Sequence, residues 1–265
     1  MIENDDFDAL KRAYCAYVDN YRKEDGALPV MMQLKLTHTM MVVDNAKKIV
    51  RGENFNDDEA SSAIAAALLH DTGRYEQLKL YNTFRDSESV DHAVFSYNIA
   101  NEKGFVAGWL HEKEIMQAVL VHNRRELPPD MISPFAVKIA KVVRDADKLD
   151  IFRILEDQIK KTDWRTDARA FWNLKTAAAP NPEVVRSIME KRPVDYQQIA
   201  SLSDFVMIQV GWMINDLNFA TSRKLCYERK HIEFRRVFLH ELSNDESIDK
   251  VCDLAETVLS EVGNV

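Results

Sequence analysis

The adjacent residues His70 and Asp71 occupy a position in the chain that is hard to explain without a ligand. They follow the apolar, alanine-rich run 63–69 and stand directly before the helix-breaking pair Thr72-Gly73. An imidazole and a carboxylate at the buried end of a helix lose their hydration, which is costly unless something binds both of them. A metal ion is the simplest explanation for this pair.

Three further histidines, His38, His92 and His122, lie inside or at the end of segments with an apolar period, and an acidic cluster at 145–150 follows them. A lone histidine on an apolar face is usually a satisfied core residue. Together, however, these side chains suit a helical bundle in which ligands from several helices converge on one ion. Mixed nitrogen and oxygen donors favour iron, manganese, zinc, cobalt or nickel over an ion that prefers thiolates.

The elements that must position these side chains are predicted to be helices. The chain of 265 residues has only seven glycines and seven prolines, and its long stretches are rich in Ala, Leu, Met, Lys, Glu and Ile. Most of these residues lose little rotamer freedom in a helix. We therefore expect an all-α protein with almost no strand. Its first helices are predicted at about 6–22, 31–51, 57–71, 89–103, 112–122 and 133–161, with His70 and Asp71 at the far end of the third and an interruption allowed near Asp150 in the last.

The segment 72–89 is predicted to be irregular because it is unusually polar. A loop of that length beside suspected ligands is often functional. Residues 162–265 are interpreted as helices that pack around the ligand-bearing core, and no linker is evident, so the whole chain 1–265 is predicted to form a single domain. The remaining histidines are interpreted as ordinary surface or packing residues: His111, His231 and His240.

Charge and cysteine usage exclude several classes of protein. The formal net charge of −8 argues against a general nucleic-acid-binding protein, whose affinity depends on a broad basic surface. Cys15, Cys226 and Cys252 are odd in number and widely separated, which is typical of free thiols in a reducing compartment. The start of the chain is acidic, and no apolar run approaches the roughly 18 residues that span a bilayer. We expect a cytoplasmic protein without a membrane partner, and the sequence does not indicate an oligomeric state.

The order His…His-Asp…Asp, closed by the run 147–149 (DKL), resembles the HD-domain superfamily of metal-dependent phosphohydrolases. The resemblance covers roughly residues 31–155, which it implies are the metal-binding core of an HD-type helical bundle, with the helices of 162–265 packed on that core. Within the core, the runs 70–77 (HDTGRYEQ) and 83–86 (TFRD) are similar to a little-characterised bacterial branch of the superfamily.

This resemblance implies one or two divalent metal ions. A first ion would be held by four residues: His38, His70, Asp71 and Asp147. Asp147 is preferred to Asp145 because the last ligand of the family typically precedes a basic residue and a leucine, as Asp147 precedes Lys148. His92 and His122 match the extra histidines of members with two ions, in which Asp71 would bridge the pair.

The resemblance also implies hydrolysis of a phosphoester or phosphoanhydride in a small, phosphorylated and nucleotide-like substrate by metal-activated water. Asp71 would position both metal and water. Arg74 and Lys148 are the first choices for binding phosphoryl oxygens and offsetting charge in the transition state. Two alternatives stay open at this point. In the first, the chain would be a ligand-binding or regulatory HD protein that has no catalytic turnover. In the second, it would be an HD-type oxygenase with paired iron.

Overall fold

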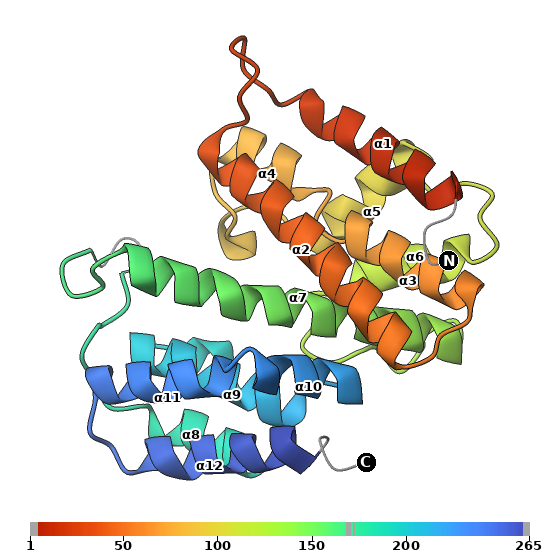
Figure 1. Ribbon diagram of the computed structural model, residues 1–265. Helices are drawn as coiled ribbons and strands as arrows, with labels where there is room; N and C mark the ends of the chain where they lie inside the picture. Colours follow the sequence, from red (N-terminus) through yellow and green to blue (C-terminus); the bar gives the residue numbers. More distant parts are fainter. Residues whose placement is uncertain (1–4, 168–170, 172, 262–265) are drawn as a thin grey trace. The chain divides into compact units, whose positions relative to one another are not determined.

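The structure is a computed structural model that describes residues 5–167, 171 and 173–261, most of which are helical (Figure 1). No β-strand forms among these described residues, in which an isolated bridge joins Lys175 and Ser201. The prediction of an all-α protein is therefore confirmed. No helix within the same ranges is long and apolar enough to cross a membrane.

The chain divides into two compact units, Met1–Asp147 and Lys148–Val265. The first contains α1 (Asp5–Asp19), α2 (Val30–Gly52), α3 (Asp57–Leu69), α4 (Arg74–Tyr81), the 3-10 helix η1 (Asp86–Glu88), α5 (His92–Glu102), α6 (Glu112–Val121) and the first half of α7 (Pro134–Lys161). The second contains the remainder of α7, α8 (Pro182–Met189), the 3-10 helix η3 (Tyr196–Gln198), α9 (Leu202–Asn215), α10 (Ala220–Glu228), α11 (His231–Leu242) and α12 (Ser247–Ser260). That residues 1–265 form one domain stays a prediction.

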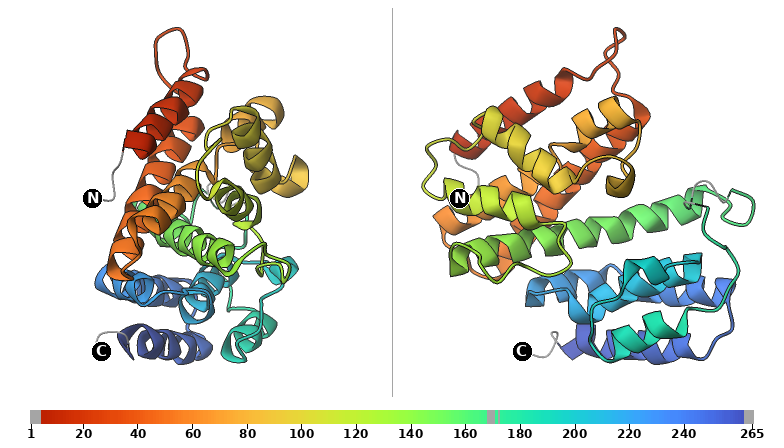
Figure 2. Two further views of the ribbon diagram at one scale, coloured as in Figure 1. Left: turned by 90° about the vertical axis from the view of Figure 1, so that its right-hand side faces the viewer. Right: turned by 180° about the vertical axis from the view of Figure 1, so that it is seen from behind.

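Helix α3 is the central helix of the first unit. It begins with a capping box, in which the Asn56 side chain accepts a hydrogen bond from the Glu59 amide and the Glu59 carboxylate accepts one from the Asn56 amide. Every residue from Ala60 to Leu69 is buried, and α3 packs against α1, α2 and α6 (Figure 2). The alanines explain this position, because their small side chains let three neighbouring helices approach closely. The sequence predicts a helix with His70 and Asp71 at its far end, and α3 ends at Leu69, so the pair directly follows it.

Helix α1 supports the turn that follows α3. The Tyr17 hydroxyl donates a hydrogen bond to the carbonyl oxygen of Thr72, at 3.2 Å, and the hydroxyls of Tyr14 and Tyr75 lie 3.1 Å apart. Burial raises the pKa of Tyr17 to about 12, so its hydroxyl remains a donor at neutral pH. The first helix of the chain thus fixes the backbone next to His70 and Asp71.

The prediction that 72–89 is irregular is wrong for more than half of that segment, because α4, with eight residues, and η1, with three, form within it. Helix α4 escapes detection since it has no apolar stripe. Its buried residues are Tyr75 and Gln77, which meet polar partners. The interruption allowed near Asp150 does not occur, because α7 is continuous from Pro134 to Lys161.

The second unit encloses a buried ion-pair network. The guanidinium of Arg235, on α11, donates to a carboxylate oxygen of Glu156 at 2.7 Å and to the amide oxygen of Gln209, on α9, at 2.7 Å. The same Glu156 oxygen lies 2.6 Å from Nδ1 of His231. Burial alone would raise the pKa of Glu156, but His231 and Arg235 outweigh it and hold the pKa below its usual value. His231 is therefore a packing residue with a charged partner, which agrees with its interpretation from the sequence.

Candidate metal centre

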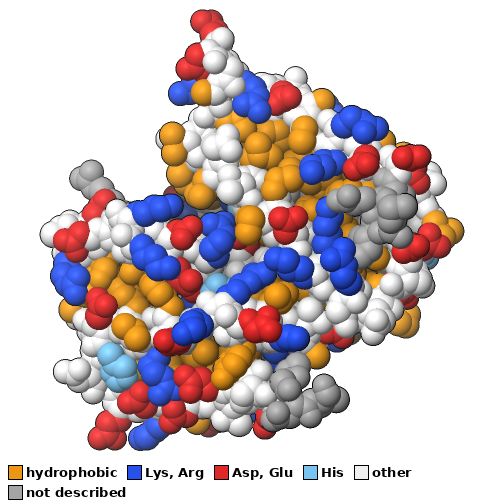
Figure 3. All heavy atoms as spheres, viewed as in Figure 1, with side chains coloured by type: hydrophobic (Ala, Val, Ile, Leu, Met, Phe, Trp, Pro, Cys, Tyr) orange, Lys and Arg blue, Asp and Glu red, His pale blue; other side chains and the backbone are white. Residues whose placement is uncertain are grey.

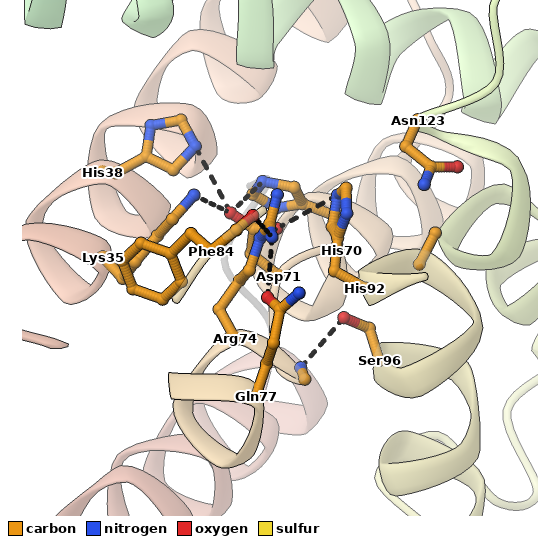
Figure 4. Close-up of polar contacts among 12 residues, drawn as sticks. Lys35, His38, His70, Asp71, Arg74, Gln77, Phe84, His92, Ser96 and Asn123 are labelled. Atoms are coloured by element: carbon orange, nitrogen blue, oxygen red, sulfur yellow. Dashed lines mark hydrogen bonds and ion pairs between the residues drawn. The ribbon is translucent and has the colours of Figure 1, made fainter. Parts of the chain in front are cut away.

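Four histidines and two aspartates converge from five helices of the first unit. Figure 4 shows His38, His70, Asp71 and His92 among them. His38 lies in the middle of α2, His70 and Asp71 directly follow α3, and His92 is the first residue of α5. His122 follows the last residue of α6, and Asp147 lies on α7. The four histidines and Asp71 are between 1% and 8% exposed and so are screened from bulk water, whereas the Asp147 side chain is 20% exposed.

Asp71 lies between two pairs of histidines and turns one carboxylate oxygen toward each pair. Its Oδ2 atom is 3.5 Å from Nε2 of His70 and 3.7 Å from Nε2 of His38. Its Oδ1 atom is 3.7 Å from Nε2 of His92 and 4.0 Å from Nε2 of His122. A carboxylate in this position can bind two ions, one through each oxygen.

These contacts define two half-sites that share Asp71. The first half-site consists of His38, His70, Asp71 and Asp147, whose Oδ1 atom lies 3.1 Å from Nε2 of His38 and 3.9 Å from Nε2 of His70. The second half-site consists of Asp71, His92 and His122, and the Nε2 atoms of the two histidines are 3.1 Å apart. Donors bound at about 2.1 Å to one ion are roughly 3 to 3.5 Å apart, which these separations approach.

Hydrogen bonds to backbone carbonyls orient two of the imidazoles. Nδ1 of His70 lies 2.7 Å from the carbonyl oxygen of Ala67, and Nδ1 of His122 lies 2.7 Å from that of Val119. Because a carbonyl oxygen only accepts, the proton of each ring is on Nδ1 and the lone pair is on Nε2, facing the centre. Nε2 of His70 is buried and has no hydrogen-bond partner among the described residues. A metal ion would supply the missing partner, so these residues fit the implied metal.

The charges of the centre also suit a cation. Burial alone would raise the pKa of Asp71, but Lys35 and then His70 outweigh it and hold the pKa well below its usual value. Burial lowers the pKa of both His70 and His122, the latter strongly. At neutral pH the carboxylate is therefore anionic and these two imidazoles are neutral, which is the protonation state that binds metal.

Lys35 is a site residue that the sequence analysis missed. Its ammonium lies 2.6 Å from Oδ2 of Asp71, and its side chain is 18% exposed. The ammonium also lies 5.5 Å from the centre of the Phe84 ring (Figure 4). Lys35 precedes His38 by three residues and so shares its face of α2, which is the one signal in the sequence that points to it.

Arg74, predicted to bind phosphate, lies beside the centre and contacts protein groups there. Its Nε atom is 3.3 Å from Oδ1 of Asp71, and its Nη1 atom donates to Gln77, to the carbonyl oxygen of Phe84 and to Asp86. All four of these hydrogen bonds to described residues use Nε or Nη1, and the guanidinium carbon also lies 5.6 Å from the centre of the Phe84 ring. Lys148, the other predicted cation, belongs to the second unit, where its ammonium lies 5.9 Å from the centre of the Trp212 ring.

Other cations near the ligands in sequence have structural partners. Arg144 donates to the carbonyl oxygens of His122, Arg124 and Arg125 and so fixes the chain after α6. Arg85 pairs with Glu88 at 2.7 Å. On the face drawn in Figure 3, basic and acidic side chains are intermixed with apolar ones.

Comparison with known families agrees with this geometry. Residues 36–151 match the family model of the HD domain. No curated protein and no solved structure matched the chain. Residues 36–151 therefore form an HD domain, the domain of a superfamily of metal-dependent phosphohydrolases, and the resemblance seen in the sequence is confirmed at that level. The matched segment contains all six residues of the two half-sites, whereas membership of the bacterial branch stays a prediction.

Proposed function

We propose that the chain is a metal-dependent phosphohydrolase that cleaves a phosphoester or phosphoanhydride of a small, nucleotide-like molecule. One observation carries the proposal. A single buried carboxylate, Asp71, has four histidine Nε2 atoms within 4.0 Å, two on each of its oxygens. The six residues would hold one or two divalent ions, which would supply Lewis-acid chemistry for a displacement at phosphorus.

Each residue near the centre has a distinct proposed role. When bound, the ion or ions supply a Lewis acid that makes water a nucleophile at neutral pH. His38, His70, His92, His122 and Asp147 bind the metal, with Asp71 shared. Asp71 also orients the nucleophilic water. The buried imidazoles keep bulk water out and thereby strengthen every electrostatic interaction inside.

Positive charge beside the centre supports a phosphate substrate. Arg74 has Nη2 outside its four contacts with protein groups, and we propose that this nitrogen binds a phosphoryl oxygen. Lys35, whose side chain is partly exposed and whose ammonium is already beside Asp71, is a second cation suited to this role. For Lys148 the proposal rests on its place directly after Asp147 in the sequence.

The proposal is tested by a turnover screen of phosphorylated metabolites with protein loaded with Mn²⁺, Fe²⁺, Co²⁺, Ni²⁺ or Zn²⁺. We expect release of phosphate from at least one substrate, and loss of that activity in His70→Ala and Asp71→Ala with the helical circular dichroism spectrum retained. Metal binding without turnover of any substrate would instead favour a regulatory HD protein. Oxygen consumption by the iron-loaded protein would favour an oxygenase.

The cations are tested separately with Arg74→Gln and Lys148→Gln. We expect kcat/KM to fall by about 10²-fold in each, as is usual when one preorganised donor to the transition state is removed. Arg85→Gln is the matched control, because Arg85 is nearby in sequence but pairs with Glu88 on the surface. If a variant keeps the wild-type kcat/KM, the residue that it replaces takes no part in the mechanism.

A further inference from the structure

His92 differs from the other oriented histidines in what holds its Nδ1 atom. Nδ1 of His70 and Nδ1 of His122 each donate a hydrogen bond to the backbone carbonyl oxygen three residues earlier, that of Ala67 and that of Val119. Nδ1 of His92 instead lies 2.5 Å from a carboxylate oxygen, Oδ2 of Asp86. A carboxylate bonded to the outer nitrogen fixes the ring and makes the inner nitrogen a stronger metal ligand.

Asp86 is itself held by two residues of α4. Its Oδ1 atom accepts hydrogen bonds from Nη1 of Arg74 at 3.0 Å and from the amide nitrogen of Gln77 at 3.1 Å. Gln77 is fully buried, which is costly for an amide unless its polar atoms are bonded. Arg74 and Gln77 are also bonded to each other, at 2.7 Å, so the two donors to Asp86 form one unit.

The same two residues hold the backbone on both sides of Asp86. Nη1 of Arg74 donates to the carbonyl oxygen of Phe84 at 2.8 Å, and the side-chain amide nitrogen of Gln77 donates to the carbonyl oxygen of Val90 at 3.1 Å. The segment 82–91 is therefore fastened to α4 at several points around the carboxylate. Polar side chains that led to the prediction of an irregular segment, Asp86 among them, are therefore used in hydrogen bonds to α4.

We propose that Asp86 is the positioning residue of the second half-site, acting through His92, and that Arg74 and Gln77 hold it in place. The inference rests on the metal centre of the proposed function but not on turnover. It predicts that the half-sites differ. In the second, the orientation of one ligand depends on the segment 82–91, whereas His70 in the first is oriented by the carbonyl of its own helix end.

The test is metal binding by the full-length protein, measured by calorimetric titration of the metal-free form with Mn²⁺ and by the absorption spectrum of the Co²⁺ form. We expect Asp86→Asn to weaken binding of the ion at the second half-site, the one lost in His92→Ala, by 10 to 100 times and to change the Co²⁺ spectrum. The ion at the first half-site should keep its affinity. Glu88→Gln is the matched control, since Glu88 lies in the same short helix but pairs with Arg85 on the surface.

A double-mutant cycle with His92→Ala separates positioning from a general effect on the fold. If Asp86 acts through His92, Asp86→Asn has no further effect on metal affinity once His92 is alanine. Asp86→Glu, which keeps the carboxylate, should restore part of the affinity. Unchanged metal affinity in Asp86→Asn, equal loss at both half-sites, or additive effects in the cycle would each overturn the inference. Because no turnover is measured, failure of the proposed hydrolysis does not alter these outcomes.

Discussion

Gly73 allows the turn after Asp71 to lie directly against the backbone of α5. Its backbone is right-handed helical, with φ −69° and ψ −17°, so space rather than conformation requires glycine here. A Cβ atom added at this position would lie 2.6 Å from the Ser96 nitrogen, 2.9 Å from the Phe95 carbonyl carbon and 3.1 Å from the His92 oxygen. All three atoms belong to the backbone of α5, which cannot turn aside as a side chain can.

The effect of Gly73→Ala can be estimated from these distances. Ordinary van der Waals contact begins near 3.4 Å and the new Cβ would lie 2.6 Å from the Ser96 nitrogen, so α5 must withdraw by the difference, about 0.8 Å. We expect the free energy of unfolding to fall by about 1–3 kcal/mol, the usual cost of overpacking. Because His92 is the first residue of α5, it moves away from Asp71 by more than the roughly 0.2 Å that a metal site tolerates.

Urea denaturation of the metal-free protein measures the stability, and elemental analysis with Mn²⁺ titration measures the ions retained. We expect Gly73→Ala to lose stability and to bind the ion of the second half-site more weakly. Gly211→Ala is the control for overpacking outside the centre, since its Cβ would lie 2.9 Å from Cγ1 of the buried Ile188, and we expect it to lose stability but to keep its metal affinity. Wild-type stability and metal affinity in Gly73→Ala would refute the packing argument.

Three further predictions concern stability. Glu156→Gln should lower the free energy of unfolding by about 3 kcal/mol at pH 7, because it leaves Arg235 buried without its anion. Since the pKa of Glu156 is lowered in the folded state, the stability that its charge contributes is present above its usual value of 4.5 and is lost as pH falls through the lower folded pKa. The difference from wild type should therefore shrink below pH 4.5. Asn56→Ala should cost about 1 kcal/mol by removing the cap of α3, measured by urea denaturation. Removing metal with a chelator should lower the melting temperature, and a divalent ion at 100 times its Kd should restore about 2.7 kcal/mol.

Each of these predictions has a result that contradicts it. A constant difference between Glu156→Gln and wild type from pH 7 to pH 3 would show that the carboxylate charge does not stabilise the network. An unchanged midpoint in Asn56→Ala would mean that solvent replaces the cap. A melting temperature indifferent to chelator and to every divalent ion would argue that the histidine centre holds no metal.

The position of the reactive pair could be predicted because its signals are local. Acidic residues mark the start of α3, an alanine run fills it, and Gly73 follows its end. The helix forms over Asp57–Leu69, so His70 and Asp71 stand where the sequence places them. The other histidines could be proposed from their apolar surroundings, and the structure brings them together. That they bind metal remains a prediction.

Lys35 and Asp86 could not be found in this way because each has an ordinary local explanation. A lysine on a helix and an aspartate in a polar segment are usually solvated. The role of Lys35 depends on its contact with Asp71, which is distant in the sequence. The role of Asp86 depends on its contact with His92, from which a turn that was not predicted separates it. Helix α4 was missed for the same reason, since the burial of Gln77 is explained only by the tertiary partners that it meets.

The tyrosine contacts of α1 determine where the chain can be shortened. A fragment cut to the family match, residues 36–151, would lose the hydrogen bond from the Tyr17 hydroxyl to the Thr72 carbonyl oxygen. It would also lose the hydrogen bond between the hydroxyls of Tyr14 and Tyr75. It would also uncover the side of α3 against which α1 packs. Expression trials for crystallography or directed evolution should therefore begin no later than Asp5, even though the family signature starts some thirty residues further on.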